Sequence, residues 1–167
     1  MALQLFKIAS TTVESPVTEI TFSSIPSGYT DLLVYISGRS NRASQQVDNL
    51  FITFNSNTSS YSTRLLQGNG STASSSTQPF RYASLSIDAS ASTSNVFSSH
   101  SIYIPNYTSS NNKSFSADSV SENNATAAQS DLVAGLWSNT AAITSITLGP
   151  EVSTWATNST FTLYGVL

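Results

Sequence analysis

The amino-acid sequence predicts an all-β fold, an antiparallel β-sandwich of jelly-roll type with about ten strands and little or no helix. Ser, Thr and Asn make up 68 of the 167 residues, and their side chains compete for the backbone hydrogen bonds that a helix needs. Val, Ile, Thr, Phe and Tyr, which suit a pleated sheet, fall in short alternating segments about 12–18 residues apart. Ser, Asn, Gly and Pro separate these segments, as expected for many short strands joined by turns.

The first part of the chain contains five expected strands. They cover residues 3–9, 17–24, 31–37, 50–54 and 61–67. The strand at 17–24 alternates and ends before a turn that contains Pro26 and Gly28. The strands at 31–37 and 50–54 are apolar at consecutive positions, which predicts that both of their faces are covered.

The rest of the chain continues the same pattern. Six more strands are expected at 79–89, 95–105, 113–121, 130–138, 143–149 and 159–167. The low-complexity run 68–78 is expected to be a mobile loop. Pro105 has no N–H for a ladder and should end its strand, with Tyr107 over the end of the sandwich and the Asn pair at 111–112 in the left-handed turn. Residues 122–129 are expected to close into one helical turn.

A chain of this length fits one domain, residues 1–167, with residues 1–16 as an extended arm or an edge strand. It shows no repeat of 20–50 residues. The sequence begins with Met and ends in a strand-like segment, so we expect a complete small polypeptide. Its 17 aromatic residues are enough to supply much of a core.

Composition excludes several classes of protein. The net charge is −3 and the six cations are scattered, whereas a nucleic-acid-binding protein needs a basic stripe to neutralise phosphates. The absence of cysteine excludes disulfides, thiolate metal sites and a cysteine nucleophile. We find no signal peptide and no apolar run long enough for a transmembrane segment, so no membrane partner is expected.

The single histidine, His100, is the one candidate base for a Ser-His-Asp hydrolase. With 35 serines and five aspartates a chance match is nearly certain, and the chain has no Gly-x-Ser-x-Gly nucleophile elbow. A strand histidine satisfied by its neighbours is the favoured interpretation.

The acidic residues give no clear indication of a catalytic site or a metal site. Candidate carboxylates for a glycoside hydrolase are Glu14, Glu19, Asp118, Glu122 and Glu151, and no aromatic-lined cleft is indicated near them. Asp118 and Glu122 lie four residues apart, but the Asp-rich loop of a calcium site is absent. The GNG at 68–70 fits a turn better than a phosphate-binding loop. We therefore expect no catalytic residue, no metal and no cofactor.

Four other residues are candidates for contacts with a ligand or a partner. For Trp137 a place in the core is favoured, whereas for Trp155 an interface or ligand role and simple packing are equally favoured. Arg39 and Arg42 in the polar segment 38–49 could make interface hydrogen bonds, although a solvated loop is favoured.

The Asn-x-Ser/Thr pattern of N-glycosylation occurs six times. It is found at Asn57, Asn69, Asn106, Asn112, Asn124 and Asn158. Because Ser and Thr are a third of the chain, 13 asparagines give roughly four matches by chance. The pattern is therefore no indication of glycosylation.

Several segments together resemble a known family. They are ITFSSIPSGYTDLLVYISGRSNRAS, LFITFNSNTSSYSTRLLQGNGS, IYIPNYTSSNNKSFSADSVSENNATA and AGLWSNTAAITSITL, and the likeness runs from about residue 17 to the end. This pattern resembles small structural proteins and fibre-tip modules of tailed bacteriophages, cyanophages and marine phages especially. The family has no catalytic motif, so the resemblance implies no site residue and no enzymatic activity.

The resemblance implies a place in the virion. A small complete chain fits a capsid decoration (cement) protein, a homotrimer that binds the major capsid protein on the outside of the shell and stabilises it. Residues 1–10, the 38–49 loop or the GNGS loop would then face the capsid. The alternative is a tail-fibre-tip or receptor-binding module that recognises a host-surface glycan or protein, although fibres normally need a shaft for which this chain has no room.

Overall fold

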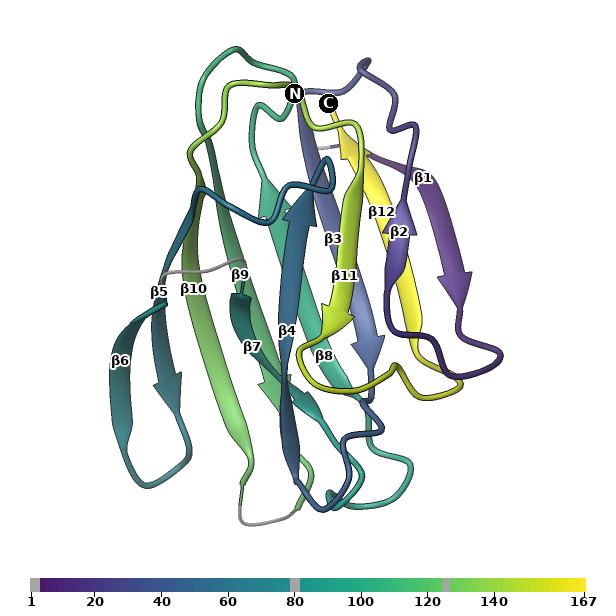
Figure 1. Ribbon diagram of the computed structural model, residues 1–167, viewed down its shortest axis with the longest axis vertical. Coiled ribbons are helices and arrows are strands. Elements are labelled where there is room, and N and C mark those ends of the chain that lie inside the picture. The colour runs from purple at the N-terminus through teal and green to yellow at the C-terminus, as the bar shows by residue number, and fades with distance from the viewer. Residues whose placement is uncertain (1–3, 79–81, 125–126) are drawn as a thin grey trace.

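The computed structural model describes residues 4–78, 82–124 and 127–167, which form twelve strands and no helix. The strands build two antiparallel sheets that face each other, so the prediction of an all-β sandwich is confirmed (Figure 1). Their bounds are β1 Leu5–Thr12, β2 Ile20–Phe22, β3 Asp31–Gly38, β4 Val47–Phe54, β5 Tyr61–Gly68, β6 Ala73–Gln78, β7 Tyr82–Asp88, β8 Ser98–Ile104, β9 Lys113–Ser121, β10 Gln129–Trp137, β11 Ile146–Pro150 and β12 Thr160–Val166.

The two sheets differ in size. The large sheet has eight strands in the order β1-β12-β3-β8-β9-β10-β5-β6, and the small sheet has four in the order β2-β11-β4-β7. The chain crosses between the sheets repeatedly, while β5-β6 and β8-β9-β10 stay within the large sheet as neighbours. This order does not establish jelly-roll connectivity, which has two Greek keys over eight strands.

The space between the sheets has an apolar end and a polar end. At the apolar end, Phe54 packs edge-on against Phe115 and Trp137 at centroid distances of 5.6 Å, and Tyr61 stacks on Trp137. At the other end, the inward-facing positions of β8, β9 and β10 are occupied by serines, Asp131 and His100, beside the apolar Ile36 and Phe161 of β3 and β12. The core is therefore divided along its length by chemistry.

Most expected strands are present, but three expectations about local structure are wrong. Residues 68–78 are not one loop, because 73–78 form β6 at the edge of the large sheet. The strand β3 is covered on one face only, since Tyr35 is 46% exposed on the other. The left-handed turn after Pro105 uses Asn106, with φ of 50°, and neither residue of the pair at 111–112.

Other local expectations are confirmed. In β4, every residue from Leu50 to Phe54 is buried, as its consecutive apolar positions predict. The strand β8 ends at Ile104, directly before Pro105. Tyr107, expected over the end of the sandwich, is fully buried as part of the hydrophobic core and donates its hydroxyl to the carbonyl of Pro26.

Two expected elements overlap the gaps in the described ranges. The described part of 122–129 contains no helix and includes a turn at residue 127, and residues 125–126 lie outside the described residues. Residues 79–81 of the expected strand 79–89 also lie outside them. No helix in the described residues is long and apolar enough to cross a membrane.

Candidate functional site

A buried carboxylate, Asp131, joins three strands at the polar end of the core. Its Oδ2 accepts hydrogen bonds from the backbone N–H of Ser86 (2.6 Å) and the hydroxyl of Ser119 (2.8 Å). Its Oδ1 accepts one from the side-chain amide of Gln67 (2.8 Å). Hydrogen bonds to a carboxylate are stronger than neutral ones, so Asp131 ties β7 of the small sheet to β5, β9 and β10 of the large one.

A second carboxylate, Asp88, is fully buried near the same end of β7. Its Oδ1 accepts hydrogen bonds from the hydroxyl of Ser121 and the amide of Asn123, both at 2.7 Å. Its Oδ2 has no hydrogen-bond partner among the described residues. Like Asp131, this carboxylate holds β7 against the large sheet through hydroxyl and amide groups.

The imidazole of His100 is buried beside these groups. Its Nε2 lies 2.8 Å from the hydroxyl of Ser98, which donates its own proton to the carbonyl of Gly38 at 2.8 Å. The Nε2–H of His100 is therefore the donor in this pair, and Nδ1, which has no partner among the described residues, carries the lone pair. Burial lowers the pKa of His100 to about 3, so the ring is neutral at pH 7.

This pair bears on the hydrolase hypothesis. Ser98 and His100 are both about 1% exposed, so a substrate does not reach either side chain in this conformation. In addition, no carboxylate among the described residues bonds Nδ1 to orient the ring as a triad requires. The geometry supports the structural interpretation of His100.

The guanidinium of Arg39 holds a loop at the polar end. Its Nη1 donates to the carbonyls of Thr93 (2.9 Å) and Val96 (2.8 Å), and its Nη2 donates to the carbonyl of Ser92 (3.2 Å). These contacts fix the connection between β7 and β8. The hydrogen bonds of the Arg39 guanidinium are thus made within the chain, although its side chain is only partly buried.

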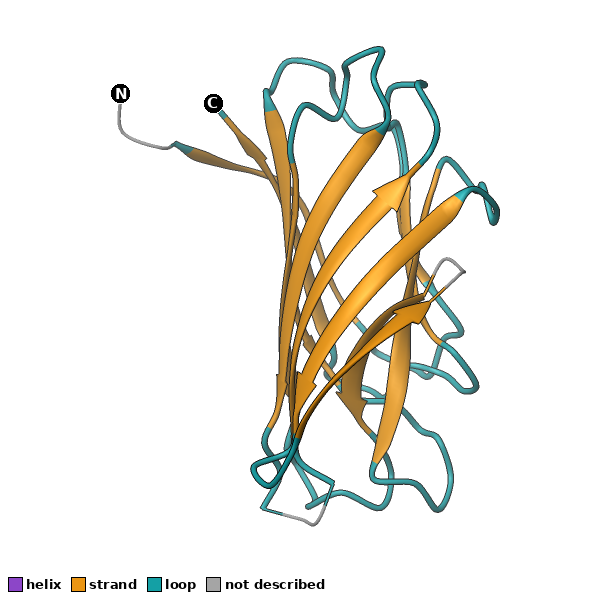
Figure 2. Ribbon diagram, turned by 90° about the vertical axis from the view of Figure 1, so that its left-hand side faces the viewer, coloured by secondary structure: helices purple, strands orange, loops and turns teal. Residues whose placement is uncertain are grey.

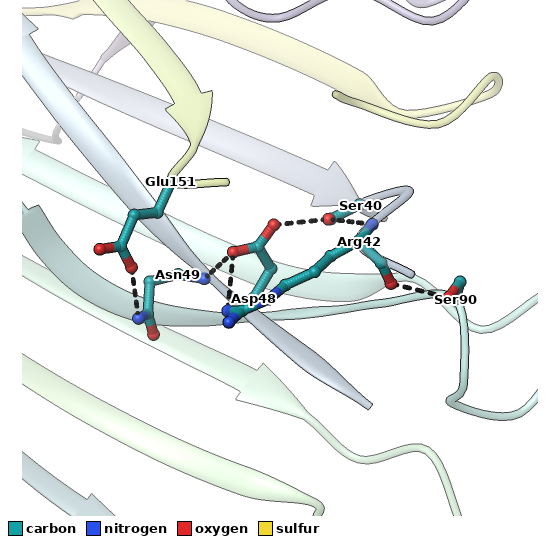
Figure 3. A network of polar contacts seen from close by, with 6 residues as sticks. All are labelled: Ser40, Arg42, Asp48, Asn49, Ser90 and Glu151. Carbon is teal, nitrogen blue, oxygen red and sulfur yellow. Dashed lines mark hydrogen bonds and ion pairs between the residues drawn. The ribbon is translucent and has the colours of Figure 1, made fainter. Parts of the chain in front are cut away.

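Arg42 lies in a network around the buried carboxylate of Asp48 (Figure 3). Its Nη1 is 3.4 Å from Asp48 Oδ1, while the hydroxyl of Ser40 donates to Asp48 Oδ2 at 2.7 Å. The carbonyl of Arg42 accepts a hydrogen bond from Ser90, and Asn49 donates to Glu151. This network ties the 38–49 segment to β4 and to the loop after β7, while the side chain of Arg42 stays 31% exposed in a segment whose residues 41–46 lie largely at the surface.

Both tryptophans pack inside the protein. Trp137 is 1% exposed in the aromatic end of the core, as favoured from sequence. Trp155 is 0% exposed, packs edge-on against Phe161 and donates its Nε1–H to the carbonyl of Leu148 at 3.1 Å. Simple packing is therefore the outcome for Trp155, and its indole offers no surface to a ligand.

The candidate carboxylates do not assemble into one site. Glu14 and Glu19 are exposed near β2, and Glu151 bonds Asn49 in the network of Figure 3. Asp118 accepts a hydrogen bond from Ser101, and Glu122 accepts one from the backbone of Asn124. No group of three or more Asp, Glu, His or Cys side chains in the described part of the chain could hold a metal ion.

The asparagines serve the turns. Among the described residues, nine other than glycine have positive φ, and five of these are asparagine, which tolerates this conformation better than most residues. They include Asn106, Asn124 and Asn158, three of the six Asn-x-Ser/Thr positions. The GNG at 68–70 lies at the β5–β6 turn, where the side chain of Asn69 accepts hydrogen bonds from Ser71 and Thr72.

The outer face of the large sheet is the most distinctive surface. Nine large apolar side chains are exposed in the described residues, and five of them lie on the part of this face from β3 to β5: Tyr35, Leu66, Tyr103, Val120 and Leu132. Figure 2 shows the sandwich from the side, turned by 90° from Figure 1. This concentration was not recognised from sequence, although each residue occupies an outward position in an alternating strand.

A tyrosine patch, defined by Tyr35, Tyr103 and Tyr164, covers one half of this face. Strand register places Tyr164 opposite Leu33, and Leu33 opposite Tyr103, in a row across β12, β3 and β8. Tyr35 meets Tyr164 edge-on at 6.0 Å. The hydroxyl of Tyr103 donates to Asp31, and this hydrogen bond is the main cause that raises its pKa.

An aliphatic patch, defined by Leu66, Val120 and Leu132, covers the other half. Leu132 lies directly opposite Leu66 on β5 and opposite Asp118 on β9. A shallow depression of about 400 Å³ opens here. It is lined by Leu66, Gln67, Gly68, Ala73, Asp118, Ser130, Asp131 and Leu132.

Comparisons of the chain with protein-family models, with curated proteins and with solved structures gave no match. The functional conclusion therefore rests on the sequence pattern and on these surfaces.

Proposed function

We propose that this chain is a non-enzymatic virion structural protein, a capsid decoration protein that binds the major capsid protein through the tyrosine patch and stabilises the shell. The observation that carries the proposal is the outward-facing row Tyr164–Leu33–Tyr103, with Tyr35 beside it. Tyrosine is enriched in the cores of protein interfaces because it combines a large apolar area with a polar end.

Two further features support a partner protein with a flat contact surface. The strands β3, β8 and β12 provide a wide hydrogen-bonded platform beneath the tyrosines, so the patch is held rigidly. Beside it lies a depression of about 280 Å³ lined by Tyr103, Pro105, Ser114, Phe115 and Ser116, which fits a protruding side chain of the partner. Binding only to the assembled shell would stabilise that shell by mass action.

This proposal places the capsid contact differently from the loops considered from sequence. The 38–49 segment directs its arginines to acceptors within the chain, and the GNGS turn lies beside the aliphatic patch. The resemblance to phage structural proteins suggests the partner, and the tyrosine patch suggests the surface.

The test is reconstitution with shells that lack the protein. Added wild-type chain should bind at a fixed ratio to the capsid subunits and raise the temperature at which the shells open. Tyr35→Ser together with Tyr103→Ser should weaken binding at least about tenfold. Val152→Ser, which removes an exposed apolar side chain elsewhere, is the matched control. No binding by wild-type chain would refute the proposal.

A second candidate is a tail-fibre-tip or receptor-binding module that recognises a host glycan or protein, and a different surface favours it. A depression of about 290 Å³ at the polar end is lined by Arg39, Ser94, Asn95, Phe97, Ala156, Thr157 and Asn158. Hydroxyl and amide groups beside one aromatic ring suit a polyhydroxylated ligand. Saturable binding of labelled chain to host cells, weakened by Phe97→Ala, with inhibition of phage adsorption, would favour this function.

A further inference from the structure

The two edges of the large sheet differ in their protection against pairing with another chain. At one edge, β1 carries Lys7 and a register shift between Lys7 and Ala9, both of which discourage an incoming strand. At the other edge, β6 has the sequence ASSSTQ, with no charge and no proline, and its register with β5 is continuous from Thr63 to Gly68. Its residues 73–77 are exposed, so β6 is the open edge.

The aliphatic patch adjoins this open edge. Register places Ser75 of β6 opposite Leu66, Leu66 opposite Leu132, and Leu132 opposite Asp118, which gives one row across four strands. Leu66 and Leu132 are 53% and 56% exposed, which is unusual for neighbouring leucines in a sheet. In this row, two exposed leucine side chains are followed by the carboxylate of Asp118.

The carboxylates near the aliphatic patch have no cationic partner among the described residues. Among the described residues the one ion pair within 4.0 Å is Arg42–Asp48, so neither Asp118 nor Glu122 is paired. Glu122 lines the neighbouring depression with Val120 and Gly68. Arg64 is the nearest cation along β5, two residues before Leu66, and its Nη1 donates to the carbonyl of Thr63.

The opposite edge of the same sheet carries complementary groups. The start of β1 and the end of β12 extend away from the body of the sandwich as a two-stranded tip (Figure 2). Leu5 and Lys7 lie opposite Val166 and Tyr164, so both point to the outer face of the sheet. Leu5 is 43% exposed, and Lys7 is exposed with no ion pair among the described residues.

We infer that the tip of β1 in one copy of this chain binds the aliphatic patch beside β6 in a second copy. Leu5 would cover Leu66 and Leu132, while Lys7, two positions along the same face of its strand, would approach Asp118. Adjacent residues on one face of a strand are about 7 Å apart, and a point between Leu66 and Leu132 lies about one and a half strand spacings, also about 7 Å, from Asp118. On β1 an apolar side chain is followed by a positive charge, and on the patch two leucines are followed by a negative charge. This match is the reason for proposing a second copy of the chain as the partner.

Such a contact is head-to-tail, because it joins two different surfaces of the same chain. Repetition of a head-to-tail contact closes into a ring when the rotation permits and otherwise continues as a filament. Leu5, Lys7 and the aliphatic patch all belong to the outer face of the large sheet, so the outer faces of the two copies oppose each other where the tip binds. This inference does not rest on the proposed function.

The experiment measures the mass of the purified chain by light scattering after size-exclusion chromatography, with no capsid present. Wild-type chain at concentrations up to about 100 μM should show a multiple of its 17.7 kDa mass. Lys7→Glu and Asp118→Lys should each weaken association about tenfold or more, because each brings like charges together. The double variant Lys7→Glu/Asp118→Lys should restore association, because the pair is re-formed with opposite sign.

Controls separate this contact from folding and from other contacts. Leu132→Ser should also weaken association, whereas Glu19→Lys, the same charge change at an exposed position near β2, should not. Thermal unfolding of each variant checks that the fold is retained. A wild-type chain that stays monomeric, or single charge variants that assemble like wild type, would overturn the inference.

A further variant distinguishes a symmetric pairing of two β6 strands. If Ser75→Pro abolished association while Lys7→Glu left it intact, the contact would be edge to edge and the inference would be wrong. Failure of the chain to bind capsid would leave these results unchanged. Conversely, a monomer that still bound shells would overturn the self-contact and leave the proposed function standing.

Discussion

The imidazole Nε2 of His100 and the hydroxyl oxygen of Ser98 lie 2.8 Å apart on the inner face of β8. Because Ser98 donates its proton to Gly38, the ring is held as the tautomer with hydrogen on Nε2. A second proton on Nδ1 would be buried without an acceptor among the described residues. The pair therefore links the stability of the sandwich to pH.

Acid should destabilise the protein through His100. Its pKa is about 3 in the folded chain and 6.5 in the unfolded chain, so below pH 6.5 the unfolded chain binds the extra proton. The free energy of unfolding should fall by up to about 1.4 kcal/mol per pH unit as the pH drops through this window. His100→Gln should remove this part of the slope between pH 7 and pH 5, measured by urea unfolding. Equal slopes for the two proteins would contradict the prediction.

Loss of the Asp131 carboxylate should strongly destabilise the fold. Asp131→Ala leaves the N–H of Ser86 and the hydroxyl of Ser119 buried without their acceptor, and we expect the free energy of unfolding to fall by about 3 kcal/mol. Glu151→Ala removes an exposed hydrogen bond to Asn49 and should cost less than about 1 kcal/mol. Denaturant unfolding compares the two; similar losses would show that Asp131 has no special role.

Gly135 should not tolerate a methyl group. A Cβ there would lie 2.1 Å from Cζ of Phe115, whose ring is already fixed edge-on against Phe54. Gly135→Ala should lower the free energy of unfolding by about 1–3 kcal/mol through overpacking. Gly28→Ala, where no atom lies within 4 Å of the added Cβ, is the control and should have little effect. A Gly135→Ala protein with the melting temperature of wild type would contradict this packing.

Arg39 should control the order of the loop between β7 and β8. Arg39→Met removes three donors to the carbonyls of Ser92, Thr93 and Val96. Since these acceptors lie near solvent, we expect a loss of only about 1–2 kcal/mol in the free energy of unfolding, with faster amide exchange in residues 92–97. Arg64→Met should leave exchange in that loop unchanged. Unaltered exchange in Arg39→Met would mean that the loop is held by other contacts.

Elements with one buried face were predictable from the sequence. The strand expected at 113–121 has the bounds of β9, and its nine residues alternate between buried and exposed positions. Pattern alone suffices there because burial of one face of a strand imposes a period of two. The same rule explains why β5 and β10 were found within one residue of their bounds.

The open edge strand and the polar end of the core were not predictable. Residues 73–77 are exposed, so β6 has no apolar alternation, and its conformation is set by pairing with β5. Asp131 occupies an inward position, which a sequence argument treats as unfavourable for a carboxylate. Its partners Ser86, Ser119 and Gln67 come from three other strands. The hydrogen bonds that offset the cost of burying Asp131 can therefore be identified only in the folded chain.

The division of the core into an apolar and a polar end has a consequence for the accuracy of strand pairing. A two-residue slip of β10 against β9 would keep the alternation of inward and outward residues. At the apolar end it would bring Val133 or Trp137 opposite Phe115, where even a methyl group at Gly135 would lie 2.1 Å from the ring. At the polar end it would separate the buried Asp131 carboxylate from the Ser119 hydroxyl. The two ends of the core therefore select the same alignment of strands that are rich in interchangeable serines.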